Sequence, residues 1–290
     1  MMAKNKIKQD TGRTVIFICY FILFIVFSFL CLYPLFFCFT NSLKTVQEFT
    51  TEGGMFKMPE SWKLTYYGAI FRSFKIGPYD FWDMAWNSFW LAFGGQFLNI
   101  LASAMVAYPL ARYNFPFKKF FYFLIIFRIT IPIIGAGAAG YKFMRFLGFI
   151  NNPMYIITCF SGFDMTALIF YGYFKGISKE YSEAAFIDGA SRLRTLFSVI
   201  LPQALPCILA LYINNVMGQW NNYSTSQIYL PQYPNLALGI FNFDSASTFL
   251  ENSTAMFFGA VVLSSLVPLA LFTSGQKLMM NNMSVGGLKG

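Results

Sequence analysis

Few side chains in this sequence could do chemistry inside an apolar environment. Histidine, the commonest general base and metal ligand, does not occur among the 290 residues. Two charged residues, Arg128 and Asp164, interrupt long uncharged runs, where an unpaired charge is costly. We predict that they form an ion pair between two membrane spans. The pair would act either as a structural lock or as part of a solute pathway that binds hydroxyl groups.

A second group of candidate residues ends another apolar run. Trp220, Asn221 and Tyr223 offer an aromatic face and an amide, the chemistry that holds sugars. Aromatic residues at the end of a span also serve as anchors at the membrane interface, and the sequence leaves both interpretations open. The five cysteines lie in apolar runs and not at metal-ligand spacing, so we expect them to be small apolar fillers.

The elements that must position these residues are membrane spans. The sequence is 57% hydrophobic and only 11% charged, whereas a soluble domain has about 25% charged residues. A span needs about 20 apolar residues, and the first run is too long for a signal peptide. We therefore predict an all-α polytopic membrane protein with six transmembrane helices, at residues 15–39, 84–111, 120–141, 154–174, 204–220 and 252–276.

The basic residues indicate the orientation of the chain. With the N-terminus inside, thirteen of the 21 lysines and arginines fall in segments on that face and seven on the opposite face. This bias favours cytoplasmic N- and C-termini, and it accounts for the net charge of +9 without nucleic acid. The predicted parts are a basic N-terminus (1–14), the first span (15–39), an extracytoplasmic segment (40–83), a core of five helices (84–276) and a cytoplasmic tail (277–290).

The longest predicted cytoplasmic loop, residues 175–203, has the pattern of a helix, a break and a second helix. Ser178 can cap the first helix, and the pair Asp188-Gly189 can end it because glycine adopts positive φ. Ser191 can cap the second helix, which runs to Pro202. Such a loop could be a docking site for a partner or an amphipathic segment on the membrane surface.

The loop resembles the EAA loop of binding-protein-dependent ABC importer permeases. Glu183-Ala184-Ala185, three residues, Gly189, nine residues and then Val199-Ile200-Leu201-Pro202 follow that motif, with Val199 where isoleucine is usual. The resemblance implies a coupling helix that docks into a separate ATPase. Glu183 would pair with a basic group there, and small residues would allow close approach. The residues assigned to this coupling site are Glu183, Ala184, Ala185, Phe186, Asp188, Gly189, Leu201 and Pro202.

The resemblance extends over most of the chain and points to the carbohydrate type. It includes Asn41–Thr45 with Glu48-Phe49, Asn87-Ser88, Ala107–Pro116, Trp220–Tyr223 and the tail Gly286–Gly290, although Pro109 stands where alanine is common. These segments resemble the subunit that partners a longer permease in the maltose importer. The implied partners are a second permease, a dimeric ABC ATPase, an extracytoplasmic solute-binding protein and membrane lipid.

The implied role is a non-catalytic permease for sugars or oligosaccharides in the cell membrane of a prokaryote. The sequence lacks a G-x-x-x-x-G-K-[ST] phosphate-binding loop, so ATP and magnesium are expected on the partner ATPase and no cofactor on this chain. The alternatives are a permease for another solute, a membrane-embedded enzyme or a channel. An enzyme would have to work with one buried acid and no histidine, and a channel would leave the EAA loop unexplained.

Overall fold

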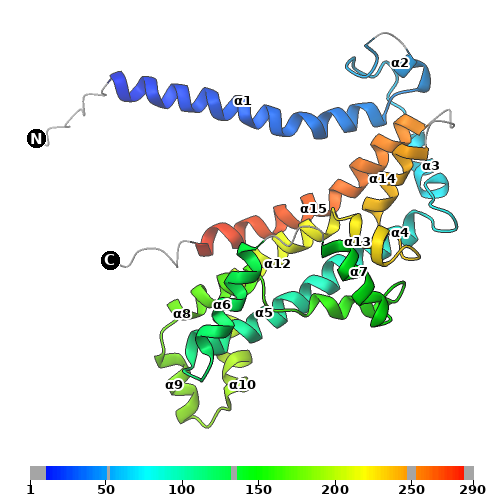
Figure 1. Cartoon of the computed structure of the whole chain (residues 1–290). Helices are drawn as coiled ribbons and strands as arrows, with labels where there is room; N and C mark the ends of the chain where they lie inside the picture. Colours follow the sequence, from blue (N-terminus) through cyan, green and yellow to red (C-terminus); the bar gives the residue numbers. More distant parts are fainter. Residues whose placement is uncertain (1–10, 51–52, 132–135, 247–252, 284–290) are drawn as a thin grey trace, which may run out of the picture. The chain divides into compact units, whose positions relative to one another are not determined.

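The computed structural model describes residues 11–50, 53–131, 136–246 and 253–283, which form helices and their connections (Figure 1). The all-helical fold class is confirmed for this part of the chain. The helices are α1 (Thr11–Ser42), α2 (Val46–Thr50), α3 (Thr65–Ser73), α4 (Phe81–Phe89), α5 (Gly95–Arg112), α6 (Lys118–Thr130), α7 (Ala136–Phe146), α8 (Met165–Gly176), α9 (Glu180–Ile187), α10 (Arg192–Thr195), α11 (Leu201–Gln203), α12 (Leu205–Trp220), α13 (Ser224–Tyr229), α14 (Leu236–Ala246) and α15 (Ser253–Met283). Three short segments of other helix types are η1 (Trp90–Gly94), η2 (Pro153–Cys159) and η3 (Leu196–Ile200).

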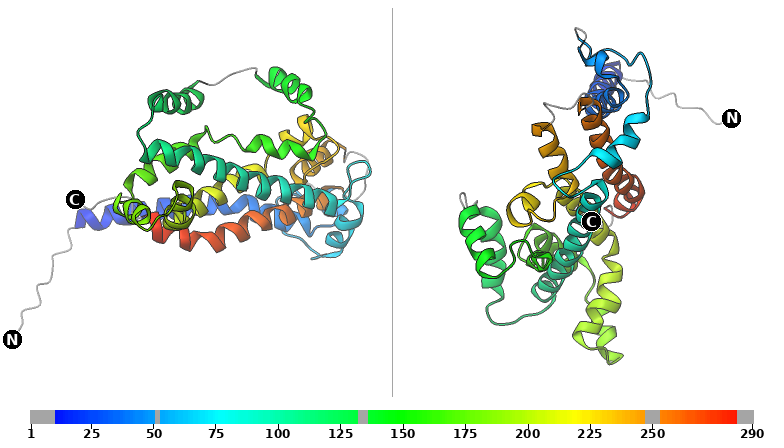
Figure 2. Two further views of the ribbon diagram at one scale, coloured as in Figure 1. Left: turned by 90° about the horizontal axis from the view of Figure 1, so that it is seen from below. Right: turned by 90° about the vertical axis from the view of Figure 1, so that its right-hand side faces the viewer.

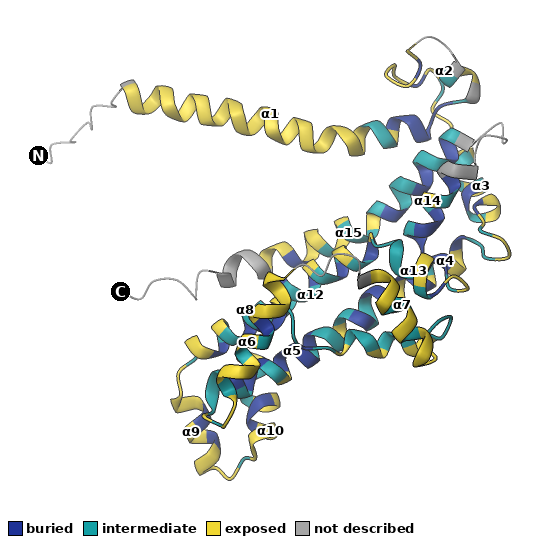
Figure 3. Cartoon of the chain, viewed as in Figure 1, coloured by how far each residue is buried: buried dark blue, intermediate teal, exposed yellow. Residues whose placement is uncertain are grey.

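The chain divides into two compact units. The first comprises residues 1–70 and 247–262, and the second comprises residues 71–246 and 263–290. In the first unit, α1 is a 32-residue helix, about 48 Å long at 1.5 Å per residue. Its apolar side chains are exposed along most of its length (Figure 3), as a helix surrounded by lipid requires.

A buried polar cluster follows the end of α1. The side chain of Lys44 has no exposed surface, and its Nζ donates hydrogen bonds to Asn41 Oδ1 (2.9 Å) and to the carbonyl oxygens of Gly54 (2.7 Å) and Met55 (3.0 Å). Burial lowers the pKa of Lys44, and the nearby charge of Glu48 partly offsets this effect. These bonds from Lys44 therefore hold Gly54 and Met55, in the predicted extracytoplasmic segment (40–83), against the end of α1.

The carboxylate of Glu48 fixes the same segment. Its Oε1 accepts hydrogen bonds from the backbone and hydroxyl of Thr45 (3.2 and 2.9 Å) and from Ser61 Oγ (3.2 Å), and its Oε2 accepts one from Glu60 N (3.1 Å). Burial raises the pKa of Glu48, but these hydrogen bonds outweigh burial and leave the pKa below its ordinary value.

The second unit is built around α5, which packs against α8 and α12 (Figures 1 and 2). Gly162, with φ +62°, lies so close to α5 that an added Cβ would be 2.8 Å from the carbonyl oxygen of Ala102. Asn87 and Ser88 join α4 to the start of α14. Asn87 Nδ2 donates to Pro234 O (3.0 Å), and Ser88 Oγ accepts from Leu236 N (2.8 Å). This bonding fixes the segment before α14.

Three helices in the described part of the chain are long and apolar enough to cross a membrane. They cover Gly12–Ser42, Phe81–Arg112 and Thr254–Lys277, and so coincide with the predicted first, second and sixth spans. The helical segments Arg192–Gln203 and Leu205–Trp220 make up a fourth candidate, bent by 79°. It includes the predicted fifth span.

The predicted third and fourth spans are not continuous helices, which corrects the sequence analysis. The third is divided into α6 and α7, and residues 132–135 between these helices lie outside the described residues. The fourth is divided into η2 and α8. Between these two segments, Gly162 adopts positive φ and Asp164 caps the first turn of α8, so an apolar run contains a helix start.

Candidate functional site

The EAA loop forms a helix, a tight turn and a second helix, as its sequence predicts. The first helix, α9, ends in a turn centred on Gly189, whose φ is +79°. Ala190 N donates to Ala185 O (2.9 Å) and Gly189 N donates to Phe186 O (3.0 Å). These two bonds define the Schellman motif, which needs a residue in the left-handed conformation after the helix. Gly189 supplies it without the strain that a Cβ would add.

The second half of the loop leads directly into the membrane helices. Ser191 Oγ accepts a hydrogen bond from Arg194 N (3.3 Å), which confirms the predicted cap of α10. Leu201 and Pro202 lie in the short helix α11, next to the 79° bend that separates this segment from α12. A displacement of the loop would therefore act on α12 through a short helical connection.

The base of the loop is buried against the ends of α5 and α8. Arg112 Nη2 donates to Ile177 O (2.7 Å), which joins the end of α5 to the start of the loop. The guanidinium of Arg192 lies 5.0 Å from the ring centre of Tyr113. A single apolar cluster joins the three elements through Ile100, Ala104, Ala107, Tyr108, Phe170, Phe174, Leu196, Ile200 and Ala204.

The tip of the loop is exposed and largely apolar. Figures 1 and 3 show α9 and α10 at one end of the second unit, with exposed residues on both helices. Ile187 is 86% exposed and Phe186 38%, and Glu183, Ala184, Asp188 and Gly189 are also exposed. Ala185 is only 8% exposed, whereas its neighbour Ala184 is exposed.

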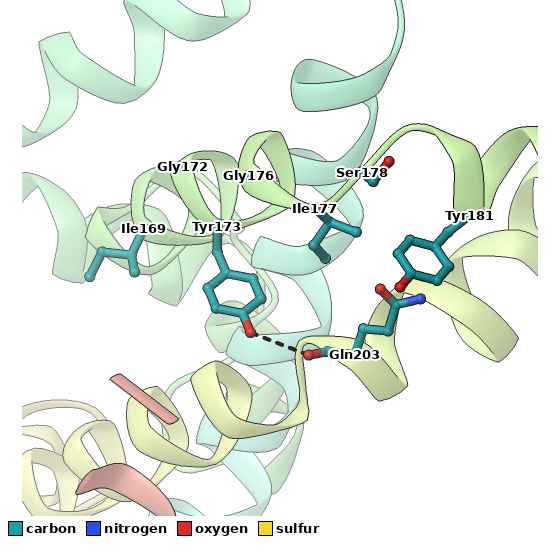
Figure 4. A pocket seen from close by; sticks show the side chains of 8 residues that line it. All are labelled: Ile169, Gly172, Tyr173, Gly176, Ile177, Ser178, Tyr181 and Gln203. Atoms are coloured by element: carbon teal, nitrogen blue, oxygen red, sulfur yellow. Dashed lines mark hydrogen bonds between the residues drawn. The ribbon is translucent and has the colours of Figure 1, made fainter. Parts of the chain in front are cut away.

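A pocket of about 590 Å³ lies where the loop leaves α8 (Figure 4). Gly172 and Gly176 of α8 form one wall, and Ser178 and Tyr181 line it from the loop. The hydroxyl of Tyr173 donates to Gln203 O (3.3 Å), which links α8 to α11 beside the pocket. The loop is thus bonded to the bundle at Ile177 and at Gln203, and both of these residues line the pocket.

Asp164 lies at the centre of a polar network within the apolar bundle. Its Oδ2 accepts from Asn99 Nδ2 (2.6 Å), and its Oδ1 accepts from Ser103 Oγ (3.1 Å) and from Ala167 N (3.1 Å). Asn215 Nδ2 extends the network by donating to Asn99 Oδ1 (3.4 Å) and to Thr166 Oγ1 (3.1 Å). The network joins α5, α8 and α12.

Arg128 has other partners than Asp164. It lies in the last turn of α6, where its Nη1 donates to Ser161 Oγ (3.2 Å) and to Phe163 O (2.8 Å). Both acceptors belong to the loop just before Asp164, while the Asp164 carboxylate turns toward α5. Among the described residues, the structure gives each charge neutral partners in place of the ion pair that the sequence analysis predicted.

The predicted sugar contacts at the end of α12 have structural roles in large part. Trp220 is 4% exposed, and its Nε1 donates to Ser264 O (3.1 Å) and Ser264 Oγ (3.3 Å). Tyr223 stacks on Phe241 with ring centres 4.4 Å apart. Asn221 alone of the three is exposed. The indole of Trp220 therefore offers neither its face nor its N–H group to a solute in this conformation.

Sequence reasoning missed the neutral members of the Asp164 network. These are Asn99, Ser103, Thr166 and Asn215. A usable signal was present, because Asn99 and Ser103 are four residues apart and so share one face of a helix. Amides and hydroxyls carry no charge, so they do not stand out in an apolar run as Arg128 and Asp164 do.

Comparison with known proteins gives one consistent family. The sequence model of the family described as "Binding-protein-dependent transport system inner membrane component" matches residues 99–278. The chain is 29% identical over 203 residues to the diacetylchitobiose uptake system permease protein NgcG of Streptomyces coelicolor, an alignment covering 69% of this chain and 65% of that protein. It is 24% identical over 288 residues to the maltodextrin transport system permease protein MdxG of Bacillus subtilis, covering 97% and 99% of the two chains.

A solved structure shares the fold. It is a chain of a bacterial ABC transporter involved in the import of the acidic polysaccharide alginate, with a TM-score of 0.74 and 21% identity. The match covers 96% of this chain and 99% of that one. At this level of identity the comparison establishes the arrangement of helices, and the solute of that transporter belongs to that protein alone.

Proposed function

The chain belongs to the binding-protein-dependent transport system inner membrane components, and from this premise we propose that it is one of two permease subunits of an ATP-driven importer for sugars or oligosaccharides. The relatives named for diacetylchitobiose and maltodextrin transport support the solute class. A second permease, a dimeric ATPase that binds ATP and magnesium, and an extracytoplasmic solute-binding protein complete the importer. ATP hydrolysis takes place on the separate ATPase.

The observation that carries the proposal is that the EAA loop has an exposed tip and a base that is packed into the helix bundle. Its tip exposes Glu183, Ala184 and Ile187, and its base shares an apolar cluster with α5 and α8. In our proposal the tip docks into the ATPase, and closure of the ATPase pulls on the loop. Movement then passes through the base and the bent connection at Leu201-Pro202 to α12.

The membrane arrangement in this proposal keeps six crossings, with both termini on the cytoplasmic side. The three long helices and the bent pair supply four of them. The α6–α7 and η2–α8 segments supply the other two as broken spans. Interrupted backbone is tolerated at membrane depth where it is buried in protein or lines a water-filled path. The breaks at Gly162 and before Asp164 therefore suit a pathway next to α5.

The experiment is ATP-driven uptake by the complete importer in proteoliposomes, supplied with its binding protein and candidate oligosaccharides. Replacing Glu183 with alanine, or Gly189 with aspartate, should abolish most uptake while the chain remains in the membrane. Lys179→Ala, an exposed change outside the motif, is the matched control. Full uptake by the Gly189→Asp variant would overturn the coupling role. Uptake of a non-sugar solute alone would overturn the solute class.

A further inference from the structure

The segment after α1 presents an apolar surface that its own unit does not cover. Phe56 is 77% exposed, Met58 62%, Trp62 64% and Leu64 69%. The exposed side chains of Lys57 and Lys63 lie among them, and they outnumber the one exposed carboxylate of residues 53–64, Glu60. We call these six apolar and basic residues the outer-loop patch: Phe56, Lys57, Met58, Trp62, Lys63 and Leu64.

The patch is held at a defined distance from α1. The buried amine of Lys44 bonds to the carbonyl oxygens of Gly54 and Met55, just before the patch begins. Lys63 N, inside the patch, donates to Leu43 O (3.2 Å). All three bonds involve Leu43 or Lys44, one or two residues beyond the last residue of α1, so the patch lies close to the end of the helix.

One contact gives the depth of the patch along α1. The ring centre of Phe56 lies 5.7 Å from that of Phe37. Phe37 precedes Ser42, the last residue of α1, by five positions, which is about 7.5 Å along the helix. Phe56 is therefore level with residues inside the predicted membrane-crossing helix Gly12–Ser42. An exposed phenylalanine therefore lies beside the last turns of a helix whose length and composition suit a membrane span.

We propose that the outer-loop patch inserts into the headgroup layer of the membrane at the C-terminal end of α1 and binds anionic lipid. The patch continues the lipid-facing surface of α1, on which Phe36 and Phe39 are 49% and 43% exposed. Trp62 has the amphipathic ring that favours this layer. Lys57 and Lys63 can extend their charges to lipid phosphates while their methylene groups stay among the apolar side chains.

The test uses the complete importer of our proposed function, with its second permease and ATPase, in vesicles of phosphatidylcholine and phosphatidylglycerol. The difference in fluorescence between the wild type and Trp62→Phe isolates the emission of Trp62. Lipids brominated near the headgroup should quench this emission more strongly than lipids brominated at the chain ends, and aqueous acrylamide should quench it weakly. The corresponding Trp220→Phe difference is the control, since a tryptophan that is 4% exposed should respond weakly to all three quenchers.

Charge is tested separately. Quenching of Trp62 by shallow bromolipid should rise as phosphatidylglycerol replaces phosphatidylcholine, and Lys57→Gln with Lys63→Gln should remove this dependence. Strong acrylamide quenching with no effect of either bromolipid would overturn the proposal. Protection of Trp62 that develops only after a solute-binding protein is added would also overturn it, and would assign the patch to that partner.

Discussion

The hydrogen bonds of Asp164 predict that Asp164→Asn and Asn99→Asp each destabilise the chain. They also predict that the two changes together, 65 positions apart, restore most of the lost stability. In Asp164→Asn, the remaining oxygen still accepts from Ser103 and Ala167 N, and asparagine caps a helix about as well as aspartate. The new amide, however, would face Asn99 Nδ2 at the position of the 2.6 Å bond. The loss of this bond to a charged acceptor costs about 1.5–3 kcal/mol. Rotation of the Asn99 amide by half a turn would let its oxygen accept from the new amide at position 164. Its Nδ2 would then face Asn215 Nδ2, which now donates to Asn99 Oδ1 over 3.4 Å, so that bond would be lost.

The reciprocal single change, Asn99→Asp, brings two carboxylates together and should destabilise the chain at least as much. The double variant keeps every bond of the network, because the carboxylate at position 99 accepts from the amide at position 164 and from Asn215. We expect a favourable coupling energy of about 1–3 kcal/mol between the two changes.

The assay is thermal unfolding of the purified full-length chain in detergent. At about 2–4 °C per kcal/mol, the single variants should lose several degrees and the double variant should recover most of the loss. An Arg128→Asp, Asp164→Arg exchange should stay destabilised, because the two residues have separate partners. Recovery in the Arg128 exchange, with none in the Asn99 exchange, would refute the network and restore the ion pair.

Three further predictions concern single positions. Gly189→Ala should reduce ATP-driven uptake because a non-glycine residue at φ +79° costs about 1–2 kcal/mol, whereas Gly189→Asn should retain most of it; equal uptake by the two variants would count against the turn. Gly162→Ala should lower the unfolding temperature, because its Cβ would meet Ala102 O at 2.8 Å, whereas Gly172→Ala, with open space around it, should not; similar losses would contradict the close packing. Glu48 has a lowered pKa, so the stability that its carboxylate contributes is present above the ordinary carboxyl pKa and is lost as the pH falls through the lower pKa of the folded chain. Proteolysis of the segment after α1 should therefore become faster at acid pH, and Glu48→Gln should weaken this dependence on pH. The same dependence in wild type and variant would contradict the role of Glu48.

The sequence predicted the features that depend on local chemistry. The turn at Gly189 and the cap at Ser191 follow from residue types that few other conformations satisfy. The long uncharged runs likewise predicted α1, α5 and α15, because helices of that length and composition are stable only in lipid or in a core. Local patterns of this kind need no knowledge of distant contacts.

Features set by contacts between distant segments were predicted poorly. Residues 154–174 are as apolar as a continuous span, yet Asp164 caps a new helix because Asn99 and Ser103 bind its carboxylate from α5. The residue type and position of Trp220 predicted an aromatic face for sugar binding, but in the structure Trp220 is buried and bonded to Ser264 of α15. A one-dimensional pattern shows that a charge or an aromatic ring needs a partner, but the fold decides which partner it meets.

In our proposal, this chain works as a membrane subunit of an ATP-driven importer. The most direct test is isolation of the tagged full-length chain from native membranes in mild detergent, followed by identification of the proteins that remain bound. We expect an ABC ATPase and a second permease in stable amounts, with loss of the ATPase alone in the Gly189→Asp variant. Recovery of the wild-type chain without an ATPase would contradict it.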